Sequence, residues 1–210
     1  MHIQIIKSGK FGFFIMLLIL LPLCGNIDYV LGLWLVDVPA HTANFVVLVL
    51  LYSLLDGILT PIAIGVFAQG EIKAYEIALC IIYAVNFIAS YVCLKLGMAP
   101  ETVFVLNIAF KACVLADLLV HSKAKYAFPV HAFLKQCLLP SAVVFVLSGA
   151  FTYFMPWEAP NSFWEFLLHT LAIIICTSLM ALAIGMTKGE RLFLKKNLRD
   201  KITVKLYRKI

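Results

Sequence analysis

The stretch from Thr42 to Gln69 constrains this chain most, because it is apolar for longer than a bilayer is thick and still carries Asp56 near its middle. About 20 helical residues cross the hydrocarbon core of a bilayer. An aspartate that faces lipid at that depth costs a few kcal/mol even on lenient insertion scales. Asp56 is therefore expected to face other helices or a water-filled cavity, and the rest of the chain must supply that surrounding.

The composition places the whole chain in the membrane. Of its 210 residues, 63% are hydrophobic and 13% are charged, whereas about a quarter of the residues of a soluble domain are charged. The length accommodates about six spans with their connections and leaves no room for a separate soluble domain. The sequence predicts an all-α integral membrane protein with six transmembrane helices, and it excludes a soluble enzyme.

The apolar runs give approximate bounds for these spans. The run from Phe11 to Cys24 is interpreted as part of a span rather than a signal peptide, because Pro22 and Leu23 stand where a cleavage site needs small residues. Pro22 and Gly25 are expected to bend this first span. The longest internal connection is expected over residues 121–136. The six predicted spans are 11–31, 42–69, 75–94, 102–120, 137–154 and 163–186.

Basic residues predict the orientation. They gather in the N-terminus, the turn at Lys73, the connection 121–136 and the tail after Met186, while the opposite side holds only Lys95. Because cytoplasmic loops carry an excess of Lys and Arg, both termini are predicted to be cytoplasmic. The expected organisation is an N-terminal segment 1–10, a six-helix lobe 11–186 and a basic tail 187–210. The tail is expected to bind membrane lipids rather than nucleic acid.

Lys111 is the most costly residue of the fourth span. At 1.5 Å per residue it lies roughly 14 Å into that span, close to the midplane. Two interpretations stay open: Lys111 forms an ion pair with Asp56 or Asp117, or it lines a cavity and attracts an anionic group. Asn107 lies one turn away and either joins helices or lines the same cavity.

The second span offers two further hypotheses. Asp56 either takes up a proton or sodium ion to drive transport, or it serves in pairing and helix packing, with Tyr52 and Thr60 on the same helical stripe. The recurrence of Gly57, Pro61 and Gly65 predicts either a hinge or a row where a neighbouring helix approaches closely.

The chain lacks the patterns of an enzyme. No nucleophile stands beside a positioned base, and no two acidic residues lie within one turn of a span to hold Mg²⁺. The six cysteines form no CxxC pair and have no histidine at metal spacing. We therefore expect no catalytic residues, no metal and no cofactor.

Three strings carry a resemblance to a known family. They are SGKFGF at residues 8–13, IDYVLGLWL at 27–35 followed by Val38-Pro39, and AQGEIKAY at 68–75. They resemble the C-terminal half of bacterial polysaccharide and O-antigen flippases of the multidrug, oligosaccharidyl-lipid and polysaccharide exporter superfamily. The likeness extends over residues 7–200, and the strings around Trp34 and Gly70 are the distinctive ones.

The resemblance implies a fold and a function. Family members usually have two six-helix lobes around a central cavity, and they export polyprenyl-diphosphate-linked oligosaccharides, such as precursors of lipopolysaccharide O-antigen, across the cytoplasmic (inner) membrane. This chain matches one lobe, so the other is expected from the same gene, a second chain or a second copy. Lys111 and Asn107 would then line the substrate cavity. The alternative is a non-transporting scaffold or assembly subunit of a polysaccharide biosynthesis system.

Overall fold

The computed structural model describes residues 2–70, 72–154, 160, 162–187 and 189–192. Over these residues the chain is helical and has no strand. Six of the described helices are long and apolar enough to cross a membrane, so the chain is an all-α, multi-pass membrane protein. Most of the predicted basic tail, from residue 193 onward, lies outside the described residues.

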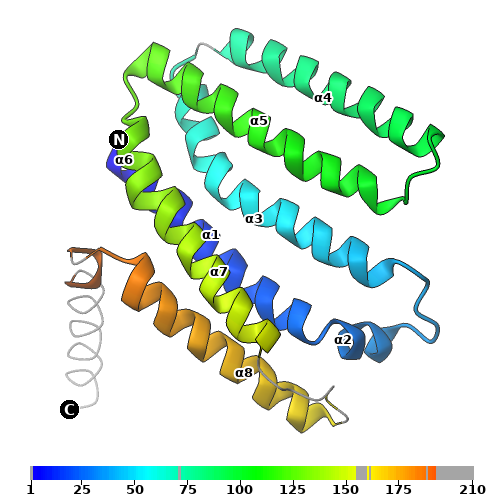
Figure 1. The fold of residues 1–210 in the computed structure, drawn as a ribbon. Helices are drawn as coiled ribbons and strands as arrows, with labels where there is room; N and C mark the ends of the chain where they lie inside the picture. The colour runs from blue at the N-terminus through cyan, green and yellow to red at the C-terminus, as the bar shows by residue number, and fades with distance from the viewer. Residues whose placement is uncertain (1, 71, 155–159, 161, 188, 193–210) are drawn as a thin grey trace, which may run out of the picture.

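The helices form a staggered row in which α5 lies between α4 and α3, and α1 lies between α3 and the pair α7 and α8 (Figure 1). The fifth span joins a short helix and a π-helical turn to α7, and the sixth ends in a π-helical turn after α8. The elements are α1 (His2–Gly25), α2 (Ile27–Trp34), α3 (Thr42–Phe67), α4 (Ile72–Lys95), α5 (Glu101–Tyr126), α6 (Val130–Phe133), η1 (Leu134–Leu138), α7 (Leu139–Phe154), α8 (Phe163–Met180) and η2 (Ala181–Gly185).

Helix α1 is the most buried span, and α4 is the least buried. Phe13, Phe14 and Leu17 of α1 belong to the same core cluster as Ile58 and Ile62 of α3. By contrast, most of the large apolar side chains of α4 point outward, as expected for a helix that faces lipid. The core of the lobe is therefore built around α1 rather than around the helix with the most apolar sequence.

Two sequence expectations about boundaries were wrong. The first span begins at His2 instead of Phe11 and ends at Gly25 instead of Leu31. The expected bend is a break, because Asn26 leaves helical geometry (φ −128°, ψ 30°) while its side-chain amide donates to the Pro22 carbonyl at 3.0 Å. The helix therefore ends one turn after Pro22, and α2 begins as a separate element.

The second error concerns the connection expected over residues 121–136, which is mostly helical. Helix α5 continues to Tyr126 and carries Lys123 and Lys125 in its last turn, where cations favour the helix dipole. Ala127 then adopts a left-handed conformation (φ 50°), and the Phe128 amide donates to the Ser122 carbonyl at 3.2 Å. Such a bond satisfies a carbonyl at a helix end, so the connection shrinks to residues 127–129.

Glycines let α1 and α3 approach closely. A Cβ on Gly12 would lie 3.1 Å from the Gly57 carbonyl oxygen, and a Cβ on Gly57 would lie 3.2 Å from the Gly12 carbonyl carbon. Because Pro61 has no N–H, the Gly57 carbonyl loses its helical partner. That carbonyl faces Gly12 of the neighbouring helix, so proline and glycine together shape this contact.

Gly12→Ala is expected to lower the free energy of unfolding by about 1–3 kcal/mol, because the added methyl group overpacks a contact made of backbone. The measurement is the unfolding midpoint in detergent. Gly149→Ala is the matched control, since nothing lies within 4 Å of a Cβ there and alanine favours helix over glycine. Equal midpoints for Gly12→Ala and the wild type would contradict the close contact.

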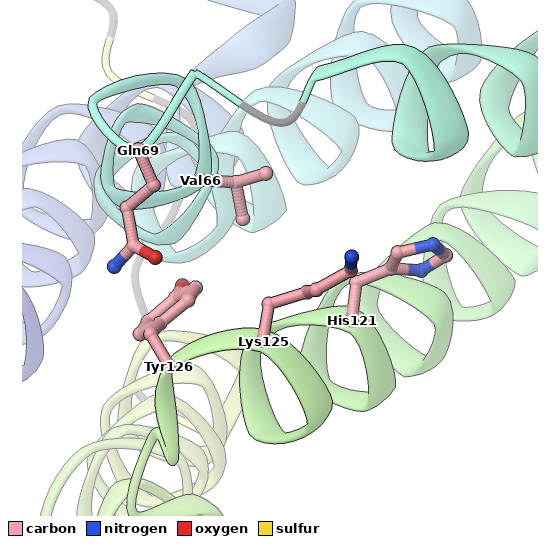
Figure 2. Close-up of a pocket in the computed structure, with 5 residues that line it drawn as sticks. All are labelled: Val66, Gln69, His121, Lys125 and Tyr126. Carbon is pink, nitrogen blue, oxygen red and sulfur yellow. The ribbon is translucent and has the colours of Figure 1, made fainter.

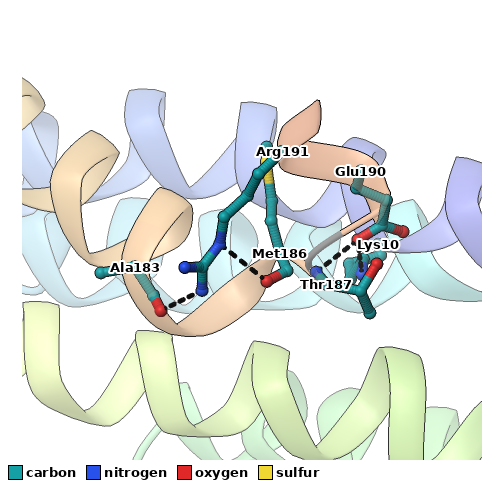
Figure 3. A network of polar contacts seen from close by, with 6 residues as sticks. All are labelled: Lys10, Ala183, Met186, Thr187, Glu190 and Arg191. Carbon is teal, nitrogen blue, oxygen red and sulfur yellow. Dashed lines mark hydrogen bonds and ion pairs between the residues drawn. The ribbon is translucent and has the colours of Figure 1, made fainter. Parts of the chain in front are cut away.

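A buried ion pair ties the segment after the sixth span to α1. The Lys10 ammonium donates to Glu190 Oε2 at 2.6 Å, and the two side chains are 1% and 7% exposed. The Thr187 amide donates to the same carboxylate oxygen at 2.8 Å. Figure 3 shows this network beside Arg191, whose guanidinium donates to the carbonyls of Ala183 and Met186. The end of η2 is thereby held against the first helix.

This ion pair predicts an acid-sensitive contribution to stability. Burial raises the pKa of the Glu190 carboxyl, but hydrogen bonds from Lys10 and Thr187 outweigh that effect and hold the pKa below its ordinary value of 4.5. A depressed carboxyl pKa stabilises the folded state above pH 4.5, and this stabilisation is lost as the pH falls through the folded-state value.

Glu190→Gln is therefore expected to cost about 3 kcal/mol at pH 7, because it leaves the Lys10 charge buried without a carboxylate. Unfolding midpoints in detergent at pH 7 and below pH 4 measure the effect, and the gap between variant and wild type should narrow in acid. Asp37→Asn removes an exposed carboxylate and serves as the control. A gap independent of pH would refute the assignment to this ion pair.

Candidate functional site

Helices α3, α4 and α5 bring polar side chains together within the membrane-spanning part of the lobe. The Lys111 ammonium of α5 lies 2.5 Å from Asp56 Oδ1 of α3. It also donates to the Tyr52 hydroxyl at 2.9 Å and lies 4.3 Å from the centroid of the Tyr52 ring. The Lys111 ammonium is therefore in contact with the carboxylate of Asp56 and with both the hydroxyl and the ring of Tyr52. We call this group, with its neighbours on α4, the mid-membrane cluster.

The cluster lies at the depth that the sequence predicts for Lys111. At 1.5 Å per residue, Lys111 is roughly 15 Å along α5 from its first residue, and Asp56 is close to the middle of α3. The hydrocarbon core is about 30 Å thick. The ion pair therefore stands near the centre of the membrane, where an unpaired charge is most costly.

The two partners of the pair differ in exposure. The Lys111 side chain is 8% exposed, whereas the Asp56 side chain is 43% exposed. The cation is therefore enclosed between helices, and the carboxylate opens away from the lobe. Because a half-exposed carboxylate at this depth cannot simply face lipid, this side of the lobe requires water or further protein.

Helix α4 extends the cluster through an amide pair. The Asn86 side chain donates to Asn107 Oδ1 at 2.5 Å, which joins α4 to α5. Asn86 Oδ1 and the Ser90 hydroxyl are buried and have no hydrogen-bond partner among the described residues. Tyr83 lies close to Tyr52 and Lys111 and is partly exposed. Asn107 therefore connects two helices. The oxygens of Asn86 and Ser90 beside it remain free to accept a hydrogen bond.

Asp117 belongs to a different group. Its Oδ1 lies 3.3 Å from Nδ1 of His121 in the next turn, so the structure pairs Lys111 with Asp56 and leaves Asp117 with a histidine. His121 also lines a small pocket of about 100 Å³ between the ends of α3 and α5, with Val66, Gln69, Lys125 and Tyr126 (Figure 2). This pocket is separate from the mid-membrane cluster.

The row Gly57, Pro61 and Gly65 lies on a face of α3 that packs against α1. Gly65 faces Ile5, whose Cδ1 would lie 2.8 Å from an added Cβ. Helix α3 continues without interruption through Pro61. The row thus provides close helix packing in this structure, and a hinge at Pro61 stays a hypothesis.

The sequence analysis did not place Tyr83 beside Lys111, although the sequence contains a pattern that marks Tyr83 as part of a polar helix face. Tyr83, Asn86 and Ser90 are spaced three and four residues apart, the spacing of one helical face. The pairing of that face with α5 depends on which helices are neighbours, and the spacing does not reveal it.

No group of three His, Cys, Asp or Glu side chains among the described residues could hold a metal ion. Comparison with known proteins found no matching family model, curated protein or solved structure. The function of the mid-membrane cluster must therefore be argued from its own geometry.

A double-mutant cycle tests the coupling of Lys111 and Asp56. Asp56→Asn is expected to cost about 2 kcal/mol of stability, less than a fully buried pair, because the carboxylate is half-exposed. Lys111→Gln should cost less, since the remaining Asp56 can be hydrated from its open side. The double variant should be more stable than the sum of the two effects predicts. Unfolding midpoints in detergent measure all four proteins, and strict additivity would exclude a direct interaction.

Proposed function

We propose that this chain moves lipid-linked oligosaccharide or polysaccharide precursor across the cytoplasmic membrane as one half of a two-lobe transporter. One observation carries the proposal: Asp56 is half-exposed at the centre of the membrane while its partner Lys111 is enclosed. The resemblance of residues 7–200 to the C-terminal half of polysaccharide flippases supports the same function. The six spans equal in number those of one lobe of such a transporter.

The exposed carboxylate of Asp56 favours the presence of a second protein wall that covers it. A charge at this depth needs a partner, water or protein, and the lobe covers only the side that holds Lys111. A second six-helix lobe over the open side of α3 would enclose Asp56 in a polar cavity between the lobes. The same gene, a second chain or a second copy of this chain would supply that lobe.

Lys111 is the group suited to a diphosphate. An ammonium has three donors, of which Tyr52 and Asp56 take two. Polyprenyl diphosphate carries its negative charge beside a long apolar chain, so it needs cationic or hydrogen-bonding company inside the membrane. Neutralisation of Asp56 by a coupling ion, either a proton or sodium, would release the ammonium to such a headgroup. This step would couple substrate binding to uptake of that ion.

The test uses the source cells with the chain deleted and then restored as wild type or variant. The measured quantity is the share of lipid-linked oligosaccharide that external glycosidase can reach. Deletion should leave the lipid-linked oligosaccharide intact but on the cytoplasmic side. Lys111→Gln should reduce export at least tenfold, and Lys111→Arg should retain most of it because the positive charge remains. Full export with Lys111→Gln would remove the headgroup role.

Two further outcomes separate the alternatives. Loss of lipid-linked oligosaccharide synthesis, rather than of its transfer, would favour the scaffold or assembly subunit. An Asp56→Asn variant that transports with unchanged dependence on the proton gradient would exclude coupling at Asp56 while leaving the transport function intact.

A further inference from the structure

A cleft of about 510 Å³ opens between the fifth and sixth spans. It lies on the side of the membrane where the connections carry most of the lysines, which we call the Lys-rich side. Its walls come from two elements that the sequence separates widely: η1 and the start of α7 on one side, and η2 with the residues that follow it on the other. Its lining includes Lys135, Gln136, Pro140, Ile184, Thr187 and Arg191. The cleft is distinct from the mid-membrane cluster, which lies on α3, α4 and α5.

Two cations face this cleft, and no acidic side chain is among its described lining residues. The nearest carboxylate in sequence, Glu190, is buried against Lys10 and the Thr187 amide. The charge of the cleft is therefore positive and is not cancelled by the adjacent glutamate. Gln136 adds a side-chain amide to the same walls, while the Thr187 side chain is hydrogen-bonded to Glu190.

Arg191 is held in position before any ligand arrives. Its Nε donates to the Met186 carbonyl at 3.1 Å, and Nη2 donates to the Ala183 carbonyl (Figure 3). A guanidinium has five N–H donors, so further donors remain for an anion. Such a planar, fixed cation suits the oxygens of a phosphate group.

The depth and rim of the cleft identify the kind of ligand. It opens at Lys135 and Gln136, near the start of the fifth span at Val130, and at Gly185, where the sixth span ends. Because the 25 residues of the fifth span exceed the roughly 20 that cross the hydrocarbon, this depth is close to the interface between hydrocarbon and water. Ile184 lines the cleft and is exposed, and the exposed Leu139 directly precedes the lining residue Pro140 in sequence. Phosphate-binding groups at the interface and apolar surface directly beside them match a phospholipid, whose headgroup and acyl chains are joined in that order.

We propose that this cleft binds the headgroup of an anionic phospholipid from the leaflet on the Lys-rich side. Basic pockets between transmembrane helices on the cytoplasmic side are suited to anionic headgroups. Lys135 and Arg191 bind the phosphate, and the acyl chains lie along Leu139 and Ile184. The inference does not depend on the proposed transport function.

The experiment is native mass spectrometry of the full chain in detergent, titrated with phosphatidylglycerol or phosphatidylcholine of equal chain length. The wild type should bind phosphatidylglycerol more tightly. Lys135→Gln should weaken that binding about fivefold, the factor expected for one cation near an anionic surface. Lys135→Arg should restore it. Lys135 is the better target than Arg191, because Arg191 also holds two backbone carbonyls.

Lys73→Gln is the matched control, because it removes an exposed cation from the same Lys-rich side but outside the cleft. Unchanged phosphatidylglycerol affinity in this variant supports a site, and a loss equal to that of Lys135→Gln overturns it. Equal affinity of the wild type for the two lipids also overturns the proposal. In a third arm, soluble glycerol phosphate should not displace the lipid, and full displacement would assign the cleft to a free phosphate ester instead.

Discussion

The hydrocarbon interior offers no hydrogen-bonding partner, so every polar group that this chain places there costs free energy unless protein or water satisfies it. Helices meet the requirement for the backbone, and the six described spans are all helical. Side chains are a harder case. Lys111 is surrounded by Asp56 and Tyr52, and the Asn86 amide is joined to Asn107. The same constraint explains why the half-exposed Asp56 is the most informative residue of the lobe.

A second demand is close contact between helices without the aid of the hydrophobic effect, since lipid tails are as apolar as leucine. The chain meets it with glycines where α1 crosses α3. Gly12 and Gly57 allow backbone to touch backbone, and Pro61 leaves the Gly57 carbonyl free to face that contact. This packing places α1 at the centre of the lobe. The buried pair of Lys10 and Glu190 then joins the residues after η2 to the same helix.

The lobe carries charge in two places with different physical settings. The mid-membrane cluster is a neutral pair in a medium of low dielectric, where separation of the partners is costly. The cleft at the ends of the fifth and sixth spans is a positive surface at the interface, where ions and lipid headgroups compensate charge. Under the proposed transport function, the first setting suits a group that changes partner. The second suits a lasting contact with the surrounding leaflet.

The sequence alone determined the class of the protein, the number of its spans and the presence of Asp56 and Lys111 at mid-membrane depth, because hydropathy and helical rise depend only on order along the chain. It did not determine helix ends, since the break at Asn26 and the continuation of α5 to Tyr126 depend on local hydrogen bonds.

Only the tertiary structure decided which helices are neighbours. That choice selected Asp56 over Asp117 as the partner of Lys111, turned the Gly57 row toward α1, and joined Lys10 to Glu190 across almost the whole chain. The physical reason is that a polar stripe specifies a face of a helix, while the packing of all spans together decides what that face meets.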